Sequence, residues 1–181
     1  MIWDSLGLIS VVASWLGLLF MIWYWKGDVN KTFSQNAARS KTTIIYYALL
    51  WLICLPLFTW FMLIPFYEAL ELNILFRTFA ILASSGMLIA ALIPETIGWK
   101  VNVHRFSAFL MAWCFVPLVL LISLSPTASN LAKVVSFSSV LFMLFSATYM
   151  YRRNAEHPKL LILQGVYIAV FQISVLIAYY F

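Results

Sequence analysis

Six long blocks of apolar residues, separated by short polar stretches, dominate the pattern of this chain. Apolar residues fill each block almost continuously, which is typical of a membrane span and not of an amphipathic surface helix. Each block holds about 20 residues, enough for a helix to cross a hydrocarbon core of roughly 30 Å. The pattern predicts helices at residues 5–25, 43–66, 73–93, 103–123, 131–151 and 160–181.

The composition fits a membrane protein and excludes a soluble one. The 181 residues are 65% hydrophobic and 9% charged, whereas soluble domains are about 25% charged. So few charges cannot cover the surface of a soluble protein of this size. A backbone in lipid must satisfy its own hydrogen bonds, and a helix does so within one segment. We therefore predict an all-α fold: a polytopic, six-transmembrane-helix bundle forming a single domain over residues 1–181.

Lysine and arginine are distributed unevenly among the polar stretches. Nine of the eleven basic residues fall in the first, third and fifth loops, and only Arg77 and Lys133 fall on the other side. Basic loops stay in the cytoplasm, so both termini are predicted to be extracytoplasmic in a plasma or inner membrane. The same rule accounts for the net charge of +5, and we predict no nucleic-acid partner. The largest loop, residues 26–42, is polar and basic, and we expect it to be mobile.

A polar island, "PETIGWKVNVHRF" at residues 94–106, separates the third and fourth apolar blocks. Pro94 is expected to end the third helix, Gly98 to permit the turn, and Asn102 to cap the fourth helix. His104 is left without a structural role that requires histidine. We therefore expect His104→Gln to leave stability nearly unchanged, and we regard His104 as the residue of this turn most suspect of function.

His104, Glu95 and Arg105 in this island are candidate ligand-binding residues. A Glu95–His104 pair would fix the angle between two helices, and a lipid-modifying enzyme could use it at the inner interface. The second histidine, His157, lies beside Glu156 on the same predicted side, but the spacing of these residues matches no metal motif. No catalytic or phosphate-binding motif is present. We predict no catalytic residue, no metal and no cofactor.

Two glutamines are the most polar side chains deep within the predicted spans. Gln164 and Gln172 are eight residues apart in sequence, which places them within about 80° of each other on a helix. They are expected either to hydrogen-bond neighbouring helices or to line a ligand site. The lack of a carboxylate at this depth disfavours proton- or sodium-coupled transport, which usually requires one.

Glu68, Glu71 and Arg77 lie close together in sequence on the predicted outer side. Arg77 is about one turn inside the third helix, and we expect its side chain to extend outward to the two carboxylates. Such a cluster is either solvated or an outward-facing binding site for a polar head group.

Small residues recur along several predicted helices and make faces that allow close helix approach. The clearest face combines Gly7, Ser10, Ser14 and Gly17, and a second combines Gly165 and Ala169. These faces pack either within the chain or against another subunit, in a homo- or hetero-oligomer. Membrane lipids are the other predicted partners.

The segments "SSGMLIAALIPE" and "VHRFSAFLMAW" together resemble the hairpin between the third and fourth helices of the DRAM-type group of small six-helix membrane proteins and related bacterial families without assigned function. The shared pattern is a run of small residues, a proline, and a histidine that opens the next helix, and it covers about 35 residues. The resemblance implies a non-enzymatic or uncharacterised membrane protein. It also implies that His104, which matches the histidine of the shared pattern, is the residue of most interest.

Together these patterns predict a small integral membrane protein without catalytic activity: a membrane subunit, or a binder of lipid or a small apolar ligand. One alternative is the substrate-binding component of a small-solute transporter. The other is a lipid-modifying membrane enzyme that uses His104 and Glu95.

Overall fold

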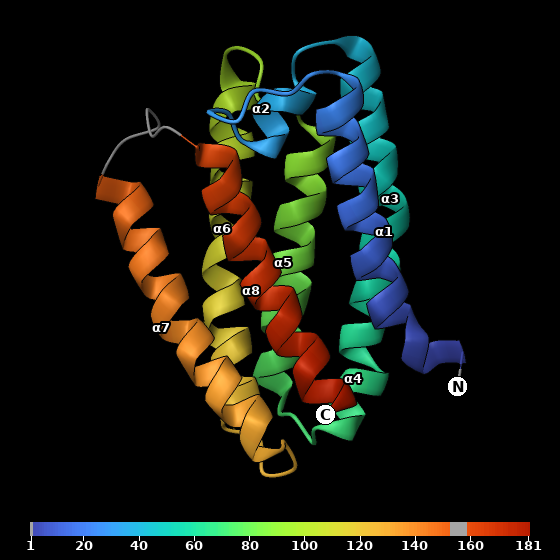
Figure 1. Cartoon of the computed structure of the whole chain (residues 1–181), viewed down its shortest axis with the longest axis vertical. Helices are drawn as coiled ribbons and strands as arrows, with labels where there is room; N and C mark the ends of the chain where they lie inside the picture. Colours follow the sequence, from blue (N-terminus) through green and yellow to red (C-terminus); the bar gives the residue numbers. More distant parts are fainter. Residues whose placement is uncertain (1, 153–158) are drawn as a thin grey trace.

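A computed structural model describes residues 2–152 and 159–181, and every secondary-structure element in these ranges is a helix (Figure 1). Six helices are long and apolar enough to span a membrane, which confirms the prediction of an all-α, six-helix membrane bundle. The long helices are α1 (Ile2–Tyr24), α3 (Lys41–Leu63), α5 (Ile74–Leu92), α6 (Trp99–Ser123), α7 (Asn130–Arg152) and α8 (Leu160–Tyr180). The short helices α2 (Phe33–Ala37) and α4 (Pro65–Ala69) have five residues each.

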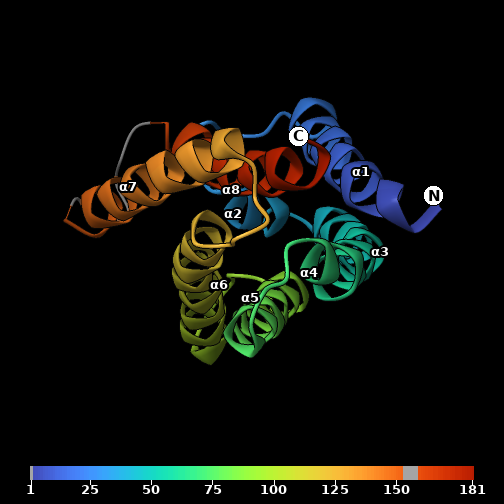
Figure 2. The same ribbon diagram turned by 90° about the horizontal axis from the view of Figure 1, so that it is seen from below.

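The six long helices alternate in direction, so both ends of the chain lie at the same end of the bundle (Figure 1). Helix α4 also lies there, and α2 lies at the opposite end; we call these the α4 end and the α2 end. Viewed along the bundle, α1, α3, α5, α6 and α8 surround the interior, and α7 lies outside them against α6 and α8 (Figure 2). The positive-inside pattern predicts that the α2 end faces the cytoplasm.

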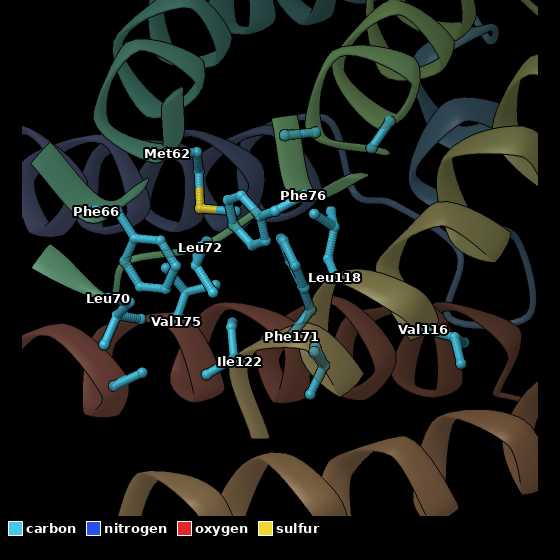
Figure 3. Packing of buried hydrophobic residues seen from close by; sticks show 14 of the residues in the cluster. Met62, Phe66, Leu70, Leu72, Phe76, Val116, Leu118, Ile122, Phe171 and Val175 are labelled. Carbon is cyan, nitrogen blue, oxygen red and sulfur yellow. The ribbon is translucent and has the colours of Figure 1, made fainter. Parts of the chain in front are cut away.

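Helix α4 packs against α3 at the α4 end of the bundle and places Phe66 in the hydrophobic core. Proline at position 65 has no N–H and disfavours a helical conformation in the residue before it, so α3 ends at Leu63 and α4 starts with proline in its first turn. The predicted helix 43–66 lies within one candidate membrane span, Lys41–Ala69, which the structure divides at Ile64. Phe66 of α4 is fully buried and stacks on Phe76, with ring centroids 5.5 Å apart (Figure 3).

The first loop, residues 26–42, contains the short helix α2 and the start of α3. The expected mobility of this loop stays a prediction. Thr32 caps α2 and Ser40 caps α3, each in a reciprocal capping box. The buried Asn36 side chain accepts from the Asp28 N–H at 2.7 Å and donates to the Asp28 carbonyl at 2.9 Å. These side-chain bonds to the backbone take the place of water as partners of the loop and give a polar segment a defined local structure.

The small-residue faces are used for packing inside the chain. Ser10 and Ser14 of α1 are buried. A Cβ atom on Gly7 would collide with the ring of Phe61, and one on Gly17 would collide with Leu50. These glycines therefore let α3 side chains approach the α1 backbone. Assembly with another subunit through such faces stays a prediction.

Candidate functional site

The turn between α5 and α6 starts its second helix earlier than predicted. Gly98 adopts a positive φ of 64° and serves as the N-cap of α6, so the helix begins at Trp99. Only glycine adopts such a conformation readily. Asn102, the expected cap, lies exposed within the first turns of the helix instead, and that prediction is wrong. The third apolar helix ends at Leu92, before Pro94, as expected.

His104 has a structural role in this turn. Its side chain is buried, with 3% exposed, and its Nδ1 lies 2.8 Å from the carbonyl oxygen of Ile93. Ile93 is the C-cap of α5, where carbonyl groups lack helical partners. The imidazole therefore ties the end of α5 to the beginning of α6, and the view that His104 has no structural role is corrected.

Glu95 pairs with Arg105 and not with His104. Arg105 Nε donates to Glu95 Oε1 at 2.7 Å, and the side chains are 9% exposed for Glu95 and 61% exposed for Arg105. The three predicted residues of this turn are thus brought together, but as two separate contacts. The His104–Glu95 pair that the enzyme alternative requires is not formed.

Gln164 and Gln172 both face the side of α8 nearest α1 and α2. Gln164 Oε1 accepts from the backbone N–H of Phe33 at 2.9 Å, which holds α2 against α8. Gln172 Oε1 accepts from Trp15 Nε1 of α1 at 2.6 Å. The prediction that these amides hydrogen-bond neighbouring elements is confirmed, and their role toward a ligand stays a prediction.

The predicted outer cluster lies at the α4 end, opposite the His104 turn, and consists of Glu68, Glu71 and Arg77. Both glutamates are exposed, and neither forms an ion pair with Arg77 among the residues that the structure describes. The guanidinium of Arg77 stacks on the ring of Tyr67 instead, 3.8 Å from its centroid. A cation above an aromatic face is attracted to it, so the expected extension toward the carboxylates is corrected.

A spacious crevice lies between α6, α7 and α8, and none of the candidate binding residues predicted from the sequence lines it. It has a volume of about 490 Å3. Its walls are Phe109, Ala112, Trp113 and Val116 of α6, Leu144, Ala147 and Thr148 of α7, and Tyr167 of α8. Helix α7 leans away from α6 and α8 toward the α2 end (Figure 1), and the small side chains of Ala112 and Ala147 leave room there. We call this hollow the lateral crevice.

The two hydroxyl groups that line the lateral crevice, those of Tyr167 and Thr148, already have partners. The Tyr167 hydroxyl donates to the carbonyl oxygen of Ala112 at 2.7 Å, and the Thr148 hydroxyl donates to that of Leu144 at 2.8 Å. The rings of Phe109 and Trp113 are about half exposed and lie 5.7 Å apart, centroid to centroid. The crevice therefore offers mainly hydrocarbon and aromatic surface.

No group of three His, Cys, Asp or Glu side chains is placed to hold a metal within residues 2–152 and 159–181. His157 and Glu156 lie outside the described residues. Comparison with protein-family models, with curated proteins and with solved structures gives no match to this chain. The resemblance to the DRAM-type group accordingly stays a prediction.

Proposed function

We propose that this integral membrane protein binds the acyl chain of a membrane lipid in the lateral crevice. The observation that carries the proposal is a hollow of about 490 Å3 with almost wholly apolar walls. Ligand sites in proteins have volumes of about 300–1,000 Å3 and are lined mainly by apolar and aromatic side chains. The crevice meets both conditions on a helix surface that lies among the spanning segments.

The hydrogen bonds at the walls favour hydrocarbon over a polar solute. Because the Tyr167 and Thr148 hydroxyls donate to carbonyls of the chain itself, an acyl chain can enter without leaving either hydroxyl unpaired. A lipid tail leaves one apolar environment for another, so its affinity depends on close packing against rings such as Phe109 and Trp113. Specific retention of a lipid then requires a contact with its head group as well.

Arg105 is suitably placed for that head-group contact. It precedes Phe109 by four residues in α6 and therefore lies one turn from it along the same helix face, toward the α2 end. Its side chain is 61% exposed. The bond to Glu95 uses one of the five N–H donors of a guanidinium, so the remaining donors can bond a lipid phosphate while Glu95 fixes the orientation of the side chain.

The proposal predicts that filling the lateral crevice displaces lipid. Ala147→Phe places a ring in the crevice, whereas Ala13→Phe places one on an exposed position of α1. The purified variants are compared by native mass spectrometry from a mild detergent, with extraction and counting of bound phospholipid. We expect Ala147→Phe to lower retention of bound lipid roughly tenfold, equivalent to about 1.4 kcal/mol, and Ala13→Phe to leave it unchanged. Equal retention in both folded variants would refute the proposal.

The enzyme alternative receives less support because His104 and Glu95 each bond a different group. A transporter component would need a route for a polar solute, and no observation favours one. A role as a non-catalytic subunit is compatible with lipid binding, since a bound lipid can lie between two membrane proteins.

A further inference from the structure

Arg77 is a cation in the first turn of a membrane span, and it has no anionic partner among the residues that the structure describes. Helix α5 and its candidate span both run from Ile74 to Leu92. The side chain of Arg77 is partly buried, and its Nε is buried without a hydrogen bond to residues 2–152 or 159–181. A charge that leaves water without a partner is costly. This position therefore favours binding of an anion from outside the chain.

The ring of Tyr67 fixes the position of this guanidinium. Cζ of Arg77 lies 3.8 Å from the ring centroid. Tyr67 belongs to α4 and packs against the hydrophobic core, and its carbonyl oxygen accepts from the Leu72 N–H at 3.2 Å. A guanidinium stacks through its flat face, whereas its N–H groups lie in its plane. The terminal NH2 groups, which are not buried, can therefore donate to an acceptor while the stack holds their orientation.

Two carboxylates lie in the same junction between α4 and α5. Glu68 follows Tyr67 directly in α4, and the N–H of Glu71 donates to the Glu68 carbonyl at 3.2 Å. Both side chains are exposed, and neither pairs with Arg77 in the described part of the chain. The junction thus presents separate positive and negative groups. Arginine and tyrosine at the end of a span lie at the level of the lipid head groups.

We propose that the α4–α5 junction binds the head group of a zwitterionic phospholipid, with the phosphate on Arg77 and the ammonium near Glu68 and Glu71. The edge of a guanidinium matches a phosphate through two parallel N–H···O bonds. The ammonium of phosphatidylethanolamine offsets the charge of the two carboxylates, whereas an anionic head group would add negative charge beside them. The junction lies at the opposite end of the bundle from Arg105, so this proposal does not depend on lipid binding in the lateral crevice.

Native mass spectrometry tests the junction with the full chain in a mild detergent. The chain is titrated with phosphatidylethanolamine or with phosphatidylglycerol that has the same acyl chains. We expect Arg77→Gln to lower the affinity for phosphatidylethanolamine about tenfold, because charge-assisted hydrogen bonds are lost. Lys133→Gln is the matched control, since Lys133 is the other basic residue of the α4 end, and it should leave the affinity unchanged.

The comparison is made both in the unsubstituted chain and in the Ala147→Phe chain. Lipid in the lateral crevice contributes equally to Arg77→Gln and Lys133→Gln in the first case and is displaced in the second. A crevice that binds no lipid leaves the difference between these two variants intact. Failure of this proposal is therefore distinguishable from failure of the proposed function.

Substitutions of the neighbouring residues separate the parts of the junction. Tyr67→Leu removes the ring under the guanidinium and should weaken phosphatidylethanolamine binding, whereas Tyr67→Phe keeps the ring and should preserve it. Joint substitution of Glu68 and Glu71 by Gln should abolish the preference for phosphatidylethanolamine over phosphatidylglycerol.

Three results would overturn the proposal. One is an Arg77→Gln chain that binds phosphatidylethanolamine as tightly as the Lys133→Gln chain. Another is equal affinity of the chain with an intact junction for the two lipids. Inorganic phosphate distinguishes the sources of the anion: it should leave the bound lipid in place, and displacement of the lipid would identify a site for free phosphate instead.

Discussion

Gly86 shows how a single residue sets the distance between two spans. A Cβ at this position would lie 2.7 Å from the backbone carbonyl oxygen of Ser107 in α6, and a backbone atom cannot move aside without moving its helix. We expect Gly86→Ala to lower the free energy of unfolding by about 1–3 kcal/mol through overpacking, measured by denaturant titration in detergent. Gly165→Ala is the control, because its Cβ would meet Trp15 at an ordinary 3.5 Å. Equal losses in the two variants would contradict this reading of α5–α6 packing.

His104 is the residue whose interpretation changes most between sequence and structure. Its contact with the Ile93 carbonyl predicts that His104→Leu loses about 1–3 kcal/mol of stability, because a partly buried carbonyl is left unpaired. His104→Asn should retain more stability, since an asparagine amide nitrogen occupies roughly the place of Nδ1. Thermal unfolding in one detergent compares the two. A leucine variant as stable as the wild type would restore the view that this histidine has no structural role.

At the scale of elements, the apolar blocks predict the six spans to within a few residues, because a helix is the only simple way to bury a backbone in lipid. The short helices α2 and α4 are not predicted, since five residues carry no hydrophobic period. Their local signals are present in the chain: Thr32 followed by Gln35, and a proline at position 65. The lateral crevice depends on how α7 leans against α6, which no local pattern encodes.

The docking of α2 against α8 is the element-scale contact that can be tested directly. Phe33 is buried, and its backbone N–H donates to Gln164 Oε1. We expect Gln164→Met, which keeps the length of the side chain but removes the acceptor, to speed hydrogen exchange in residues 28–40, because local opening becomes easier. Ile162→Met changes an exposed residue of the same helix and should leave exchange unchanged. Unaltered protection in the Gln164 variant would show that other contacts hold the loop.

At the scale of the whole molecule, the two cavities and the polar turn form separate units. The lateral crevice opens between α6 and α7, a smaller cavity of about 50 Å3 lies between α3, α5, α6 and α8, and the His104 turn joins α5 to α6 at the α2 end. The sequence identifies the turn because polar residues stand out against apolar ones. Among the residues that line the two hollows, the sequence singles out only Gln172 as a possible ligand contact. Alanine, phenylalanine and methionine look alike in sequence whether they fill space or surround it.

Membrane orientation is the prediction that belongs to the whole molecule. Both ends of the chain lie at the α4 end (Figure 1), and the nine basic residues of the odd-numbered loops predict that this end is extracytoplasmic. A phosphatase that folds only outside the cytoplasm, fused after Phe181, should therefore be active in a bacterial host. The same enzyme fused after Arg152 should be inactive. Without α8, the last span, the fused phosphatase stays in the cytoplasm. A cytoplasmic position of the Phe181 fusion would show that the orientation of the bundle is the reverse of the predicted one. The Arg105 end of the lateral crevice would then lie in the outer leaflet.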